Sequence, residues 1–107
     1  MTSVHYNKLV RYRIPEIIEH SGRKCVTSTL PEPDYLVKLD EKLNEELAEY
    51  QESKSMEELA DLLEVMHAVA AARGSSIDEV EQIRKEKAAE RGGFAKRVLL
   101  LEIQSDD

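Results

Sequence analysis

The apolar side chains between residues 35 and 73 recur at helical spacing, and this repeat limits the fold more than any other feature of the chain. Over residues 35–53 a single apolar stripe steps by three or four positions and consists of Leu36, Leu39, Leu43, Leu47 and Tyr50. A second helix should run from Ser55 to about Arg73, because Ser55-x-x-Glu58 is a capping box. The short break between the two helices predicts antiparallel neighbours.

Two further helices are expected, one on each side of this pair. Isoleucines at helical spacing, with Pro15 in the first turn, predict a short helix over residues 13–21. A second capping box, Ser76-x-x-Glu79, opens a helix that runs to about Arg91. The sequence therefore predicts four helices.

Two short segments carry a strand-like pattern. Residues 24–30 are β-branched and alternating, and residues 98–103 are almost entirely apolar, so the two could pair with each other. The expected fold is mainly all-α: one four-helix-bundle-like domain over residues 1–107, with a short two-stranded β appendage.

Composition excludes several classes of protein. A chain of 107 residues, 41% of them apolar, can bury one core, and no stretch approaches the ~20 apolar residues of a membrane span. Residues 1–8 lack the apolar run of a signal peptide. Cys25 is the only cysteine, which fits a reducing compartment. We therefore expect a cytoplasmic protein without a membrane partner.

Charge is unevenly distributed along the chain. The net charge of −7 argues against binding to a nucleic-acid polymer, since phosphate backbones require clustered Lys and Arg. Residues 40–64 hold ten acidic and two basic side chains, whereas residues 1–24 and 81–97 are each net positive by three. One acidic centre thus lies between two basic ends.

Carboxylates of the two central helices should meet. Glu46 and Glu49 lie about 60° apart on one helix, and Glu58 and Asp61 have the same i, i+3 relation at the start of the next. We name these four residues the carboxylate cluster. Two carboxylates about 6 Å apart repel by roughly 3 kcal/mol at an effective dielectric of 20, so a partly buried cluster calls for a cation. Ligands that are all oxygen suit Mg²⁺, with Mn²⁺ as the alternative.

A structural interpretation of the same residues stays open. Glutamates are common on solvated helix faces, and Glu58 already has a role as the capping-box residue. On spacing alone, a solvated acidic face and a metal site are both consistent with this pattern.

Several motifs together resemble a known superfamily, the all-α nucleoside triphosphate pyrophosphohydrolases, which include MazG-like enzymes, dimeric dUTPases and phosphoribosyl-ATP pyrophosphohydrolases. Glu45-Glu46-x-x-Glu49 followed by Glu58-x-x-Asp61 resembles their EExxE…ExxD signature. The small phosphoribosyl-ATP pyrophosphohydrolase-like branch is similar in four runs, which are 6–11 (YNKLVR), 14–18 (IPEII), 57–61 (EELAD) and 91–94 (RGGF). Tyr12 departs from this pattern, because the branch usually has Asp there.

The resemblance implies a reaction and a set of roles. Such enzymes cleave a nucleoside triphosphate to the monophosphate and pyrophosphate. Carried over, Glu46, Glu49, Glu58 and Asp61 would bind Mg²⁺, and Glu46 would also take the proton of the attacking water. Glu45 is expected only to support the cluster. Relatives of this kind are commonly dimers or tetramers, and a central helix that is apolar on two sides also favours a homo-oligomer.

The resemblance also gives the basic ends a role as contacts to a nucleotide substrate. The candidates precede the first helix or lie late in the last one, and they are Asn7, Lys8, Arg11, Arg13, Lys87 and Arg91. A helix start is a favourable place for an anion. The structural alternatives are a solvated basic terminus and basic residues that favour a helix C-terminus. A non-catalytic helical interaction protein with a structural metal site is the competing functional class.

Overall fold

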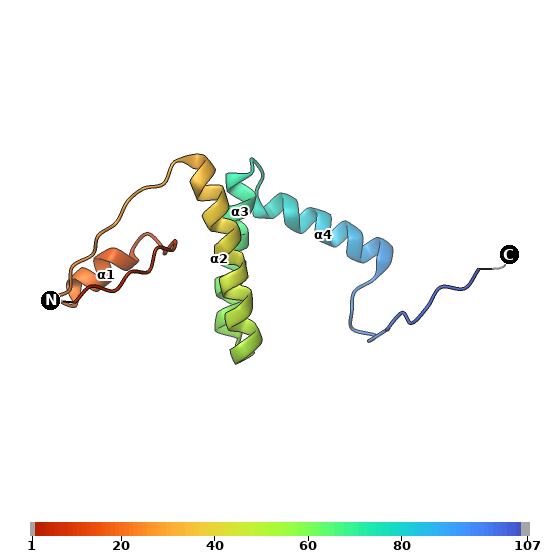
Figure 1. Cartoon of the computed structure of the whole chain (residues 1–107). Helices are drawn as coiled ribbons and strands as arrows, with labels where there is room; N and C mark the ends of the chain where they lie inside the picture. Colours follow the sequence, from red (N-terminus) through yellow and green to blue (C-terminus); the bar gives the residue numbers. More distant parts are fainter. Residues whose placement is uncertain (1, 106–107) are drawn as a thin grey trace.

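The computed structural model describes residues 2–105 and contains four α-helices in that range (Figure 1). They are α1 (Ile14–His20), α2 (Glu32–Ser53), α3 (Met56–Ala72) and α4 (Ile77–Arg91). The all-α class predicted from the sequence is confirmed. Residues 1, 106 and 107, which the predicted single domain includes, lie outside the described residues.

The predicted β appendage is wrong. Residues 24–30 and 98–103 are irregular, and none of residues 2–105 forms a strand. Figure 1 shows the reason, because the first segment precedes α2 and the second follows α4 at the opposite end of the molecule. Strand propensity gives a ladder only where a partner is in reach, and here the helices hold the two segments apart.

Helix boundaries follow from local capping. The side chain of Ser55 accepts a hydrogen bond from the Glu58 N–H at 3.3 Å, so one half of the predicted capping box at the start of α3 is present. Ser76 caps α4 in the same way. The Ser55 N–H donates to the Ser53 hydroxyl at 3.2 Å and not to the Glu58 side chain. Helix α2 starts three residues earlier than residue 35, because Pro31 stands at its N-cap, and Asp34 lies in the first turn rather than at the cap.

The packed part of the chain is the hairpin of α2 and α3, which lie side by side and antiparallel (Figure 1). Leu39 on α2 and Val65 and Ala70 on α3 are its buried apolar residues. Among residues 2–105, Glu46 is the one charged residue that is as deeply buried as these. The thin core of the hairpin therefore positions a carboxylate at its centre.

The rest of the chain is open. Helix α4 touches only α3 and runs away from the hairpin, and α1 packs against none of the other three helices (Figure 1). The radius of gyration is 19.3 Å, whereas a compact domain of this length has about 13 Å. The accessible surface is 9923 Å², about 3,800 Å² more than a compact monomer of this mass exposes. No helix within residues 2–105 combines the length and apolar character that a bilayer span requires.

Candidate carboxylate metal site

The hairpin brings the predicted carboxylates into two overlapping groups. One oxygen from each of Glu46, Glu58 and Asp61 lies within 4.8 Å of the others, across the contact between α2 and α3. A second group with the same spacing consists of Glu45, Glu46 and Glu49, all on α2. Glu46 belongs to both groups. The short connection between the helices and the i, i+3 spacings thus bring Glu46, Glu58 and Asp61 together, and Glu49 is linked to them through Glu46.

Burial distinguishes Glu46 from an ordinary surface glutamate. The residue is 6% exposed, and its Oε2 atom has no hydrogen-bond partner among the described residues. Glu58 Oε2 is likewise buried and unpaired within that part of the chain. A buried carboxylate oxygen without a donor is costly, and native structures rarely keep one without a reason. Both atoms lie where a ligand could pair with them.

The charged groups around Glu46 only partly compensate the negative charge of its carboxylate. Lys42, one turn earlier on α2, places its Nζ 3.3 Å from Glu46 Oε1 and 3.3 Å from Glu45 Oε2. Burial raises the pKa of the Glu46 carboxyl, and the neighbouring Glu49 carboxyl raises it further. The pKa of Glu45 is lowered instead, chiefly because the Lys8 ammonium donates a hydrogen bond to it. Two adjacent glutamates on one helix are therefore shifted in opposite directions.

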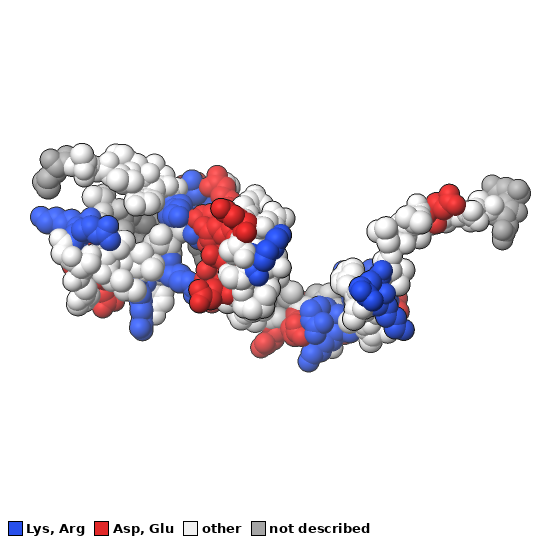
Figure 2. Space-filling model, turned by 90° about the horizontal axis from the view of Figure 1, so that it is seen from below, with Lys and Arg blue, Asp and Glu red and all other residues white. Residues whose placement is uncertain are grey.

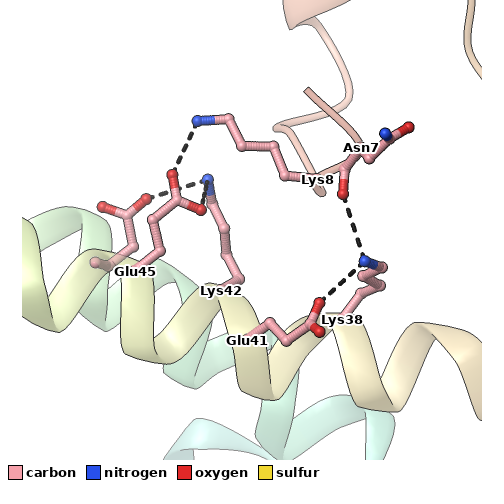
Figure 3. A network of polar contacts seen from close by, with 7 residues as sticks. Asn7, Lys8, Lys38, Glu41, Lys42 and Glu45 are labelled. Carbon is pink, nitrogen blue, oxygen red and sulfur yellow. Dashed lines mark hydrogen bonds and ion pairs between the residues drawn. The ribbon is translucent and has the colours of Figure 1, made fainter. Parts of the chain in front are cut away.

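Basic residues of the N-terminal segment, defined as residues 7–11, lie against the same groups. The Lys8 Nζ donates to Glu45 Oε1 at 2.9 Å, and the Lys38 Nζ donates to the Asn7 carbonyl oxygen at 3.4 Å (Figure 3). Arg11 Nη2 donates to Asp61 Oδ1 at 2.8 Å. The structure thus brings two of the predicted substrate-binding residues, Lys8 and Arg11, against carboxylates of these groups, whereas Asn7 contacts Lys38 through its backbone carbonyl.

The other predicted substrate-binding residues lie elsewhere. The Arg13 guanidinium stands over the Tyr12 ring, 5.7 Å from its centroid. Lys87 and Arg91 are exposed on α4, which leads away from the hairpin. In Figure 2 acidic side chains gather over the hairpin, while a separate group of basic side chains covers the α4 arm. A single chain does not bring Lys87 and Arg91 to the carboxylate cluster.

Sequence reasoning missed one member of the site and underrated another. Lys42 was not singled out, although its i, i+4 relation to Glu46 is a recognisable helical ion-pair spacing. Glu45 was assigned a supporting role only, yet its carboxylate accepts hydrogen bonds from the ammonium groups of Lys42 and Lys8. The contact with Lys8 spans 37 positions and left no local signal.

The donor set fits a hard divalent cation. Both groups consist of carboxylates, without His or Cys ligands, and hard ions such as Mg²⁺ and Mn²⁺ prefer oxygen. The two unpaired buried oxygens of Glu46 and Glu58 would gain a partner from such an ion. The residues present are therefore compatible with the Mg²⁺ expected from the sequence.

Comparison with known proteins gives little functional information. No family model matches the chain, and no solved structure matches it. An uncharacterized protein of Mycolicibacterium smegmatis is 55% identical to this chain over 42 residues, which cover 39% of this chain and 43% of that relative. The match therefore spans less than half of the relative's length, and the relative's description gives no activity.

Proposed function

We propose that the protein is a Mg²⁺-dependent nucleotide pyrophosphohydrolase that cleaves a nucleoside triphosphate, or a related nucleotide, to the monophosphate and pyrophosphate. The observation that carries the proposal is Glu46, a buried carboxylate with an unpaired oxygen where two carboxylate groups overlap. A solvated acidic face would leave this residue exposed. The proposal also rests on the resemblance of the sequence motifs to the all-α pyrophosphohydrolases.

The carboxylates have distinct proposed tasks. Glu46, Glu49, Glu58 and Asp61 would hold Mg²⁺. When bound, the ion would supply a counter-charge for the polyphosphate and a water molecule of lowered pKa. Glu46 would accept the proton of the attacking water, since it lies at the centre of the cluster. Its burial keeps bulk water from that carboxylate and strengthens the local electrostatics.

The N-terminal segment would bind the phosphates of the nucleotide. Lys8 and Arg11 already lie beside the carboxylate cluster, with Asn7 next to them and Arg13 just beyond. An arginine guanidinium suits this role because its planar N–H groups match two phosphate oxygens at once. These residues would orient the polyphosphate against the carboxylates.

Self-association is part of the proposal. The surface in excess of a compact monomer is about 3,800 Å² per chain. If each of two chains covered about half of this excess, the interface would bury about 3,800 Å² in total, within the 2,000–5,000 Å² of obligate interfaces. A homodimer or homotetramer would cover α4 and residues 98–103. Lys87 and Arg91 can contact the same nucleotide as the carboxylate cluster only if assembly brings α4 there. The single Cys25 is consistent with a cytoplasmic location for this assembly.

A screen for pyrophosphate release tests the proposal. Purified protein is incubated with canonical and modified nucleoside triphosphates, with and without millimolar Mg²⁺, beside the variants Glu49→Gln and Glu52→Gln. Glu52→Gln is the matched control, because it makes the same change on α2 outside both carboxylate groups. We expect Mg²⁺-dependent release that Glu49→Gln abolishes and Glu52→Gln retains.

The competing class is a non-catalytic helical interaction protein with a structural metal site. It shares the carboxylate cluster and the exposed apolar surface, so only activity separates the two. Thermal stabilisation by Mg²⁺ without pyrophosphate release from any nucleotide in the screen would favour that class and refute the enzyme proposal.

A further inference from the structure

The cations of the N-terminal segment pair with carboxylates that are distant in sequence. Lys8 reaches Glu45 across 37 positions, and Arg11 reaches Asp61 across 50 positions. The segment itself is irregular and exposed, and α1 behind it packs against no other helix. Besides the hydrogen bond of Lys38 to the Asn7 carbonyl, these two ion pairs are the polar contacts between residues 7–11 and the hairpin within the described part of the chain.

Cations of the N-terminal segment pair with the outer carboxylates, whereas each inner carboxylate keeps one oxygen atom without a partner. The side chains of Arg11 and Asp61 are 57% and 42% exposed, so this pair lies at the solvent edge of the cluster. Within the described residues, the buried Oε2 atoms of Glu46 and Glu58 have no donor. Asp61 belongs to the same group as these two residues. The Arg11 guanidinium is therefore bound to Asp61, while the neighbouring Glu46 and Glu58 each keep an oxygen atom without a hydrogen-bond donor.

A divalent ion in this group has to compete with Arg11. An ion held by Asp61 together with Glu46 and Glu58 neutralises the charge that attracts the guanidinium, and it repels the guanidinium directly. An exposed ion pair contributes little free energy, so displacement of Arg11 is easily offset by metal binding. After displacement, Arg11 and its neighbour Lys8 are available to an anion.

We propose that Arg11 is an exchangeable counter-ion of the carboxylate cluster: a divalent cation displaces it from Asp61, and the N-terminal segment then presents its cations to the phosphate groups of a nucleotide. The inference rests on the proposed metal site and adds a coupling between the two ligands. Because coupling free energies are reciprocal, a polyphosphate that holds the released segment also favours the metal-bound state.

Calorimetric titration with Mg²⁺ alone tests the exchange without recourse to activity. In Arg11→Gln the metal no longer has a competitor at Asp61, so we expect Mg²⁺ to bind about two- to five-fold more tightly, the range equivalent to an exposed ion pair. Arg13→Gln is the matched control, because it removes the same charge two positions away, where the guanidinium stands over Tyr12 instead. Its affinity for Mg²⁺ should equal that of the wild type.

A second measurement on the wild-type protein does not depend on the folding of a variant. Trypsin needs a free arginine side chain, so the Arg11–Tyr12 bond should be protected while Arg11 is bound to Asp61. We expect millimolar Mg²⁺ at least to double the cleavage rate at this bond. The exposed Arg97–Val98 bond serves as the internal reference, and its rate should not change.

The two proposals can fail separately. If wild-type protein shows no Mg²⁺ binding heat and no Mg²⁺-dependent thermal shift, the metal site and the exchange fall together. If Mg²⁺ binds but Arg11→Gln is no tighter than Arg13→Gln, or cleavage at Arg11 is unchanged, only the exchange is overturned. Weaker Mg²⁺ binding in Arg11→Gln also overturns it, since Arg11 would then support the site.

Discussion

Replacement of Glu46 by glutamine should stabilise the metal-free protein. The change removes one negative charge from the point where the two carboxylate groups overlap, and it keeps the shape of the side chain. Native proteins usually lose stability when a buried residue is changed. A gain is therefore a demanding test of the claim that Glu46 is kept for a ligand and not for the fold.

The size of the gain follows from the charges around Glu46. Lys8 and Arg11 already neutralise Glu45 and Asp61, which leaves Glu49 and Glu58 as uncompensated like charges within 4.8 Å. Each repels Glu46 by about 0.9 kcal/mol at the dielectric of water and by about 3.5 kcal/mol at a dielectric of 20.

The attraction to Lys42 offsets most of this repulsion. At 3.3 Å the ammonium of Lys42 attracts the Glu46 carboxylate by about 1.3 kcal/mol at the dielectric of water and by about 5 kcal/mol at a dielectric of 20. The net repulsion that Glu46→Gln relieves is thus about 0.5 to 2 kcal/mol. We expect the free energy of unfolding to rise by this amount and the stabilisation by Mg²⁺ to disappear.

Thermal melts in a chelator and in millimolar Mg²⁺ measure both effects. One kcal/mol corresponds to about 4–8 °C in a domain of this size. Protein concentration is held constant, because self-association makes the melting temperature depend on it. Glu45→Gln is the informative neighbour, since it loses the ion pairs with Lys8 and Lys42 and should lower the melting temperature. A fall for Glu46→Gln comparable with that for Glu45→Gln would refute the reasoning.

Three further outcomes are expected. Because the pKa of Glu46 in the folded protein is raised above its ordinary value of 4.5, the stability advantage of Glu46→Gln should shrink as the pH falls toward 4.5. The pKa of Glu45 is lowered, so the stability deficit of Glu45→Gln should persist above pH 4.5 and vanish below it. Chemical denaturation across the pH series measures both effects. Light scattering at micromolar concentration should show a dimer or larger species, and a stable monomer would contradict the assembly inferred from the surface area. Lys87→Ala and Arg91→Ala should change stability by less than about 0.5 kcal/mol but weaken nucleotide binding in a fluorescence titration; normal binding by folded variants would remove both from the site.

Local patterns in the sequence predicted the parts of the fold that local physics determines. The starts of α3 and α4 follow from Ser55 and Ser76, whose side chains satisfy backbone N–H groups three residues ahead. The strands failed because pairing depends on where two distant segments end up. The direction of α4 was likewise unpredictable, since a helix can bury its apolar face against another copy as well as within its own chain.

The candidate site shows the same division. Glu46 and Glu49, and Glu58 and Asp61, are joined by helical spacing within one element, and one short connection brings the two pairs together. The contact of Arg11 with Asp61 crosses 50 positions and is not encoded in any local spacing. Ion pairs between distant, exposed residues are weak, and neither composition nor hydrophobic periodicity predicts which residues form them.

The connection between α2 and α3 restricts how this chain can change its length during evolution. Only Lys54 and Ser55 join the two helices; Lys54 adopts a left-handed conformation and Ser55 already caps α3. Each added helical residue turns a helix by 100° and moves it by 1.5 Å, so an insertion accommodated within either helix would turn one carboxylate pair away from the other. Surface loops usually accept insertions at small cost. Here we expect them between α3 and α4, where residues 73–76 contact no member of the carboxylate cluster, and not at the tip of the hairpin.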